Sequence, residues 1–277
     1  MFTTSRRRLF VLGFAVFVIA ALTTVTSANH SWGGYHWART ANPFTLKIGN
    51  NVTSNWTTQF NTAIADWSNS SVMNLTAVAG TAGRNCKMVA GTVQVCNRTY
   101  GNNGWLGLAS INITGGTHIT QGSAKMNDTY FSTSTYNNPN EKLHVMCQEI
   151  GHTFGLDHQS TSGASLNTCM DYFSNTGANA NSTLSTHPNT HDYDELVTIY
   201  SHLDSSTTIA ANSAASSGFS EMDNDPNSWG YLVSQSRNGR SSTYARGNSD
   251  GTQTITHVYW TEEAAEGCRS CDHRYDH

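Results

Sequence analysis

The sequence predicts an α+β fold with a small β-rich C-terminal extension. Short segments in which apolar and polar residues alternate follow one another over residues 73–131, and such alternation is typical of strands. Apolar residues recur at helical spacing over residues 56–67, 139–155 and 191–203. A second alternating region, residues 229–262, follows a low-complexity polar stretch and predicts a small antiparallel sheet.

The N-terminus has the three-part layout of a secretory signal peptide. A basic segment, MFTTSRRR, precedes an apolar run of about fourteen residues from Leu9 to Leu22, and small residues follow at Thr26 and Ala28. The run is short for a helix that crosses roughly 30 Å of hydrocarbon. We therefore expect a secreted, extracellular protein with no stable membrane insertion after cleavage, and an uncleaved anchor is the alternative.

The length of 277 residues fits one full-sized catalytic domain with a small appendage. We expect a signal peptide at 1–28, a main domain at 29–204, a linker at 205–220 and a β-rich region at 221–277. Only 12% of the residues are charged and the net charge is -4. Electrostatic binding of nucleic acid or of acidic membranes is therefore excluded.

Six cysteines in an exported chain predict disulfides, although the sequence leaves their pairing open. Cys86 and Cys96 bracket a candidate hairpin and would close it. Cys268 and Cys271 form a C-x-x-C pair near the C-terminus, for which a small metal site with nearby histidines is the alternative to oxidation. The two remaining cysteines lie in the motifs described below.

The first strand and helix follow from the residues after position 43. The segment FTLKIG, residues 44–49, alternates and predicts a strand. Thr53 or Ser54 is the expected cap of the following helix. The apolar stripe of that helix, which we expect to pack on a sheet, consists of Trp56, Phe60, Ala63, Ile64 and Trp67.

The second helix has clear boundary signals. Asn138 is the expected N-cap, Pro139 occupies the first helical position, and Glu141 completes a capping box. Gly155 is the expected left-handed stop. The expected apolar face consists of Leu143, Cys147, Ile150 and Phe154. The buried stripe of the last helix is expected to consist of Leu196, Ile199, Tyr200 and Leu203.

The second helix carries a pattern of metal ligands. Positions 148 and 152 lie one turn apart on the same face, and Glu149 stands beside them within reach of an activated water. Gly155 tolerates a positive φ, which lets the chain turn sharply and bring His158 back toward the helix. Downstream, the segment NTCMDY contains Met170.

The segments EIGHTFGLDH at 149–158 and TCMDY at 168–172 resemble the metzincin clan of zinc endopeptidases, in layout closest to matrixins. The order of elements is also similar, and the resemblance covers roughly residues 35–203. It implies a twisted mixed sheet, an active-site helix, a Met-turn and a C-terminal helix. It also implies a zinc cofactor, a polypeptide substrate and hydrolysis of peptide bonds.

The resemblance implies a role for each matching residue. Glu149 would be the general base that takes a proton from water and passes it to the leaving amine. His152 and His158 would be zinc ligands, and Met170 would form the turn beneath the metal. Tyr172 matches a tyrosine of the astacin and serralysin branches that hydrogen-bonds the tetrahedral intermediate. Matrixins usually have proline there, so a tyrosine packed behind the turn is the alternative.

Gln148 departs from the metzincin pattern, which has histidine at this position. Its amide oxygen is a poorer zinc ligand than imidazole, although it has the right reach and lies on the right face. His144 lies one further turn back and does not replace it easily, and Asp157 is a candidate carboxylate ligand. Three interpretations stay open: an active peptidase, an inactive domain that binds protein or glycan, and a site with another metal or another hydrolytic chemistry. The retention of Glu149 favours the first.

The resemblance also bears on Cys147 and Cys169, because in metzincins these two segments pack together beneath the metal. It makes a disulfide between them plausible, and two buried free cysteines are the alternative. The strand segment LASINITG, residues 108–115, would be the edge that pairs with an extended substrate.

Two further groups of residues are candidates for ion binding. Asp192, Asp194 and Glu195 would suit the structural calcium that is common in matrixins, although an acidic first helical turn needs no ion. His118 lies in a predicted loop, where it would line the rim of the site, bind a structural ion or simply be solvated.

Overall fold

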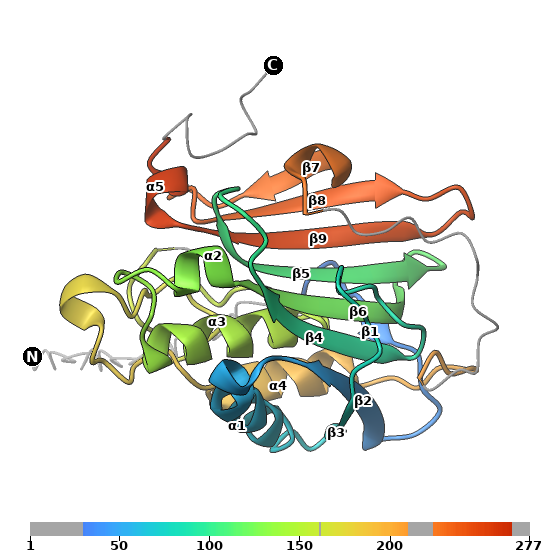
Figure 1. Cartoon of the computed structure of the whole chain (residues 1–277). Helices are drawn as coiled ribbons and strands as arrows, with labels where there is room; N and C mark the ends of the chain where they lie inside the picture. Colours follow the sequence, from blue (N-terminus) through green and yellow to red (C-terminus); the bar gives the residue numbers. More distant parts are fainter. Residues whose placement is uncertain (1–29, 161, 210–223, 268–277) are drawn as a thin grey trace, which may run out of the picture.

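The structure, a computed structural model, describes residues 30–160, 162–209 and 224–267. It has a mixed α+β architecture in which few helices pack against one large sheet (Figure 1), which confirms the expected α+β class but not a separate C-terminal sheet. The expected signal peptide, most of the expected linker and the pair Cys268 and Cys271 lie outside the described residues. None of the helices in the described part is long and apolar enough to cross a membrane.

The strands of the first part of the chain are β1 (His36–Trp37), β2 (Phe44–Asn51), β3 (Met73–Ala79), β4 (Thr92–Arg98), β5 (Trp105–Thr114) and β6 (His118–Asn127). The strands of the C-terminal part are β7 (Tyr231–Gln235), β8 (Ser241–Gly247) and β9 (Gln253–Trp260). The α-helices are α1 (Thr57–Trp67), α2 (Asp128–Phe131), α3 (Pro139–His152), α4 (Thr190–Ile199) and α5 (Glu262–Ala265). Residues 128–131 are therefore helical, although the sequence pattern predicts a strand there.

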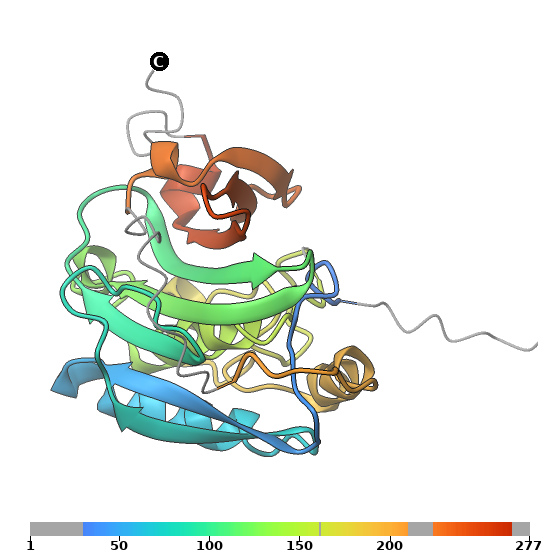
Figure 2. The same cartoon turned by 90° about the vertical axis from the view of Figure 1, so that its right-hand side faces the viewer.

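All the strands belong to a single sheet, in the order β3-β2-β4-β6-β5-β9-β8-β7, with β1 paired to β6. The strands β2, β3, β4 and β6 are parallel, and β5 runs antiparallel to β6. The C-terminal strands continue the sheet beyond β5 (Figures 1 and 2), because β9 pairs antiparallel with β5 along its length. The expectation that residues 108–115 offer a free edge is therefore wrong in this structure.

Helix α1 buries the predicted stripe, from Trp56 to Trp67, against the sheet. The helix begins at Thr57, because residues 54–56 form a short 3-10 turn first. Thr53 precedes that turn without a side-chain hydrogen bond to it, so the predicted capping role is wrong. The indole N–H of Trp67 donates to the carbonyl of Cys147 at 3.0 Å, which fastens α1 to α3.

Helix α3 begins where predicted, but the predicted capping box is only half formed, because Glu141 does not bond back to Asn138; the helix also ends earlier than expected. The Asn138 side chain accepts from the N–H of Glu141 at 2.8 Å, and Pro139 is the first helical residue. The carboxylate of Glu141 accepts from the N–H of Asn175 at 2.6 Å. The helix ends at His152, and Gly155 has a φ of +94°. A Cβ at Gly155 would lie 1.8 Å from the carbonyl oxygen of Tyr35, so only glycine fits.

Helix α4 is shorter than the apolar spacing predicts. A capping box between Asn189 and Asp192 starts it, and it ends at Ile199. Leu203 lies beyond its end and is 56% exposed, so its predicted burial is wrong. The rest of the predicted stripe is buried.

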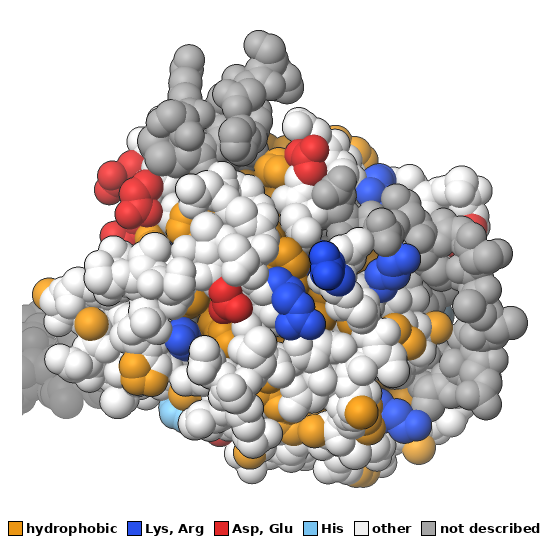
Figure 3. Space-filling model, in the orientation of Figure 1, with side chains coloured by type: hydrophobic (Ala, Val, Ile, Leu, Met, Phe, Trp, Pro, Cys, Tyr) orange, Lys and Arg blue, Asp and Glu red, His pale blue; other side chains and the backbone are white. Residues whose placement is uncertain are grey.

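The disulfide between Cys86 and Cys96 is present, with Cα atoms 6.1 Å apart, as predicted. The expected hairpin between them is absent from the described structure, because only residues 92–98 are in a strand. Charged side chains are few on the face shown in Figure 3, in keeping with the low charged fraction of the sequence.

Candidate active site

The candidate site lies where α3 packs beneath β5 and β9. Glu149 points from α3 toward β5, and a Cβ at Gly107 would lie 2.4 Å from its Oε1 atom, so glycine leaves room for the carboxylate. Glu149 is fully buried, and His152 is 1% exposed. The short turn after α3 returns His158 to the same place, where its side chain is 3% exposed.

Three imidazoles converge at this point, and one of them comes from the C-terminal region. Ligand nitrogens of His152, His158 and His257 all lie within 4.8 Å of one another. The ring centre of His257 is 3.9 Å from that of His152 and 4.8 Å from that of His158. His257 lies on β9, opposite Ala109 of β5. The motif does not include His257, although a histidine inside the apolar strand TITHVYW is a sequence signal for it.

Hydrogen bonds orient the two helix-side imidazoles. The Nδ1 atom of His152 lies 2.8 Å from the carbonyl oxygen of Leu156, so Nδ1 carries the proton and Nε2 presents its lone pair. The Nδ1 atom of His158 lies 2.8 Å from the hydroxyl of Tyr172 and 3.2 Å from a carboxylate oxygen of Asp157. Such partners on the far nitrogen are typical of metal-binding histidines. Asp157 thus contacts a histidine ring and is not part of the imidazole group itself.

The centre of this group lacks hydrogen-bond partners. The atoms concerned are Nε2 of His152, Nε2 of His158, both ring nitrogens of His257 and both carboxylate oxygens of Glu149. Buried polar atoms without partners are rare in proteins, so six of them at one place indicate a site that is suited to a ligand. A cation bound by the imidazole nitrogens would satisfy them, and three imidazoles with one open position are a donor set that suits zinc.

The electrostatics of the site also favour a cation. Burial raises the pKa of Glu149 well above its ordinary value. Burial, with the neighbouring His158, lowers the pKa of His152 to about 3, and burial lowers that of His257 well below its ordinary value. His152 and His257 are therefore neutral, which is the form that binds a metal ion. The Oε2 atom of Glu149 lies 3.5 Å from Nδ1 of His257.

Gln148 lies beside the imidazole group and contacts the Met-turn. Its Nε2 atom donates to the carbonyl oxygens of Cys169 and Asp171, each at 2.9 Å, and its Oε1 atom is buried without a hydrogen bond. Its role as a metal ligand stays a prediction. The Nδ1 atom of His144 lies 2.6 Å from the carbonyl oxygen of Ser185, so this ring is held toward another loop.

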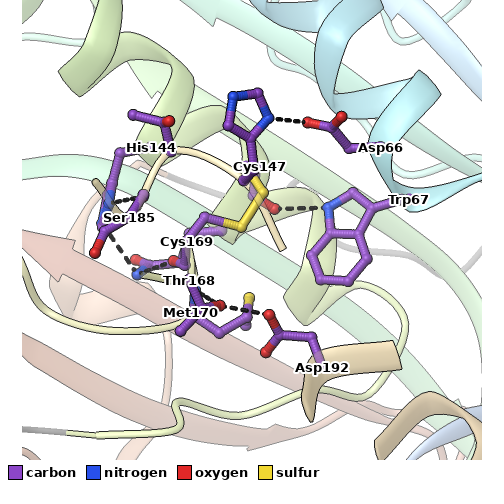
Figure 4. The surroundings of a disulfide bond; sticks show 12 residues. Asp66, Trp67, His144, Cys147, Thr168, Cys169, Met170, Ser185 and Asp192 are labelled. Carbon is purple, nitrogen blue, oxygen red and sulfur yellow. Dashed lines mark hydrogen bonds and ion pairs between the residues drawn. A yellow bond between two sulfur atoms is a disulfide. The ribbon is translucent and has the colours of Figure 1, made fainter. Parts of the chain in front are cut away.

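The disulfide between Cys147 and Cys169 joins α3 to the segment of Met170, as expected (Figure 4). Its Cα atoms are 5.9 Å apart. The sulfur of Met170 lies against α3, since a Cβ at Gly151 would be 2.7 Å from it. On its other side this segment is held by the Thr168 hydroxyl, which donates to Asp192.

The carboxylates considered for calcium do not gather. Asp192 is buried in the α4 capping box, and Asp194 is exposed. Within the described ranges, no group of potential metal ligands includes Asp192, Asp194 or Glu195.

Tyr172 lies between the imidazole group and a cavity of about 400 Å³. Its hydroxyl contacts His158 and also the hydroxyl of Ser241 on β8. Arg240 and Glu262 line the same cavity and form an ion pair at 3.1 Å. The cavity therefore adjoins Tyr172 at the ends of β8 and β9.

Comparisons with known proteins give little further information. No protein-family model and no curated protein matches the sequence. Solved structures do match, among them a structure of myroilysin that is 13% identical in sequence. That match covers 59% of this chain and 82% of the myroilysin chain, with a TM-score of 0.35. At this TM-score the likeness adds nothing to what the site itself indicates.

Proposed function

We propose that the protein is a secreted, zinc-dependent peptide hydrolase whose metal is held by His152, His158 and His257. The observation that carries this proposal is the convergence of three imidazoles beside a buried carboxylate, with no hydrogen-bond partners for the atoms at their centre. The resemblance of residues 149–158 to the metzincin motif supports the peptidase class. The two disulfides suit an oxidising compartment outside the cell.

The proposed roles divide the chemistry among this chain's own side chains. Zinc, when bound, acts as a Lewis acid that polarises the substrate carbonyl and makes a nearby water a better nucleophile. Glu149 accepts a proton from the attacking water and returns it to the leaving amine. Tyr172 donates a hydrogen bond toward the developing oxyanion from its position beside His158. His257 takes the place of the ligand that Gln148 does not supply.

The pairing of β9 with β5 determines how a substrate approaches. β9 is buried along nearly its whole length, and Ile255 and Tyr259 belong to the main core. We therefore propose that β9 stays in place during turnover. The substrate then approaches through the cavity beside Tyr172 instead of by pairing with β5.

The first test is the metal content and casein cleavage of the mature chain and two variants. We expect Glu149→Ala to keep its metal and to lose cleavage by a factor of about 100 or more, as for removal of a general base. We expect His257→Ala to lose cleavage and the one equivalent of metal that is held at this site. Thr256→Ser, one position away on β9, is the matched control and should keep both. Increased cleavage by His257→Ala would mean that β9 is an inhibitory strand and would refute this ligand assignment.

A non-cleaving, metal-stabilised module that binds protein or glycan is the second candidate. The full burial of Glu149 favours it. This function would be selected over the peptidase if the protein binds metal at His152, His158 and His257 but shows no measurable cleavage. In that case Glu149→Ala should leave the metal content and the absence of cleavage unchanged.

A further inference from the structure

We propose a second metal site, formed by His36, His118, His202 and Asp204, which takes a divalent ion such as zinc. Its residues come from three separate segments. His36 lies on β1 directly opposite His118 at the start of β6, and His202 and Asp204 follow the end of α4. This site does not depend on the proposed hydrolase activity.

The Oδ1 atom of Asp204 lies near the Nε2 atom of each of the three imidazoles, and donor atoms of His36, His118 and Asp204 all lie within 4.8 Å of one another. The Oδ1 atom of Asp204 lies 3.3 Å from Nε2 of His118, 3.6 Å from Nε2 of His36 and 3.7 Å from Nε2 of His202. The Nε2 atoms of His36 and His202 are 3.2 Å apart. Ligands bound tetrahedrally at about 2.0–2.1 Å from zinc lie roughly 3.3–3.5 Å from one another. The observed spacing therefore needs only small adjustments to hold the ion.

Hydrogen bonds on the outer side of the cluster orient two of its members. The Nδ1 atom of His36 lies 2.9 Å from the carbonyl oxygen of Gly34, so this nitrogen donates and Nε2 keeps its lone pair for the cluster. The Oδ2 atom of Asp204 accepts from the backbone N–H of Arg39 at 3.1 Å and from its guanidinium at 3.0 Å. These contacts leave Oδ1 to face the imidazoles. Outer partners of this kind are typical of metal ligands.

The Nε2 atoms of His36 and His202 are 3.2 Å apart, a distance that either a hydrogen bond from His202 to His36 or a shared metal ion accounts for. If both Nε2 atoms of His36 and His202 present lone pairs, they repel each other at 3.2 Å. A shared cation converts this repulsion into two bonds. Three imidazoles and one carboxylate suit zinc and other first-row ions, and four protein ligands are typical of a structural zinc site.

The position of the cluster indicates what the metal does. The side chains of His36 and Asp204 are 7% and 9% exposed, whereas those of His118 and His202 are 34% and 51% exposed. An ion can therefore enter from solvent while it joins β1, β6 and the chain after α4. We expect it to stabilise the fold by holding these segments together.

The test is to measure the Co²⁺ and Zn²⁺ bound per chain after equilibration and dialysis. We expect two equivalents in the unaltered protein and one in the double variant His118→Ala/His202→Ala. Both residues are partly exposed, so the variant should fold, and its circular dichroism checks this. His187→Ala is the matched control, because His187 is an exposed histidine paired with Asp66 outside both clusters, and it should keep two equivalents.

The difference between the unaltered protein and the double variant decides the proposal. Loss of one equivalent in the double variant supports the site. A second supporting result is that Zn²⁺ raises the melting temperature of His257→Ala but not that of the triple variant His118→Ala/His202→Ala/His257→Ala. Equal metal content in the unaltered protein and the folded double variant overturns it. The outcome is separate from that of the hydrolase, since His257→Ala alone should still bind one equivalent here.

Discussion

At the scale of single residues, the proposed ligand set gives Gln148 another role, because His257 is the third imidazole of the group. The Gln148 amide has two N–H groups, and both are used to satisfy carbonyl oxygens of the segment around Met170. A neutral imidazole has a single N–H group and would satisfy one of them at most. Glutamine at position 148 therefore suits a site whose third imidazole comes from β9 and not from α3.

Restoring the motif with Gln148→His should consequently destabilise the protein without raising cleavage. One buried carbonyl would lose its donor, which costs about 1–3 kcal/mol. Urea unfolding measures this loss, and casein cleavage measures the activity. A gain of activity in this variant would show instead that glutamine at position 148 is a handicap and that His257 is not an adequate replacement.

Glu141 provides a prediction about pH at the same scale. Burial raises its pKa from 4.5 to about 7. Between these values the folded protein holds a proton that the unfolded chain releases, so this group's contribution is complete below pH 4.5 and is lost as the pH rises through 7. The total is about 3 kcal/mol.

The free energy of unfolding should therefore fall from pH 5 to pH 8 by more in the unaltered protein than in Glu141→Gln, whose side chain does not titrate. Urea unfolding of both proteins across this range gives the difference. A stability difference that stays constant with pH would mean that Glu141 is already ionised in the folded state at pH 5.

At the scale of elements, the disulfide between Cys147 and Cys169 joins α3 to the segment of Met170. The bond closes a separation of 22 residues, for which about 3 kcal/mol of stabilisation is expected. The same bond holds α3 against the segment that Gln148 contacts, so it also pre-organises the imidazoles.

We expect Cys147→Ala/Cys169→Ala to lose about 3 kcal/mol of stability and to bind zinc several-fold more weakly. Cys86→Ala/Cys96→Ala is the matched control. It opens a disulfide elsewhere in the fold and should lose stability without a change in zinc affinity. Denaturant unfolding and competition with a zinc chelator measure the two effects. Equal zinc affinity in both double variants would mean that the disulfide between Cys147 and Cys169 does not help to form the metal site.

At the scale of the whole molecule, the C-terminal strands are part of the central sheet. The sequence predicts these strands and their turns correctly as local features, because alternation and turn residues act over a few positions. It does not indicate that β9 pairs with β5, since backbone hydrogen bonds between strands carry little sequence information. The motif locates Glu149, His152 and His158 because they are close in the sequence. It does not locate His257, because that residue reaches the group only through the pairing of β9 with β5.

A cross-link between β5 and β9 tests whether the sheet stays intact during turnover. Ser110 and Thr256 are paired in register, and their hydroxyl oxygens are 3.0 Å apart, which suits a disulfide between strands. We expect oxidised Ser110→Cys/Thr256→Cys to cleave casein as fast as the control Ser110→Ala/Thr256→Ala. Loss of cleavage on oxidation of the cysteine variant alone would mean that β9 has to leave the site.

The sequence by itself determined the capped helix with its Glu149 and His152 pair, the glycine bend before His158 and the alternating strands. Each of these depends on neighbours within one or two turns of chain, where side-chain spacing and backbone preferences act directly. Only the tertiary structure decided that His257 meets the other two imidazoles and that His36, His118, His202 and Asp204 meet one another. Residues that are distant in the sequence come together because the sheet buries apolar surface as a whole, and no local pattern records which polar side chains that burial brings into contact.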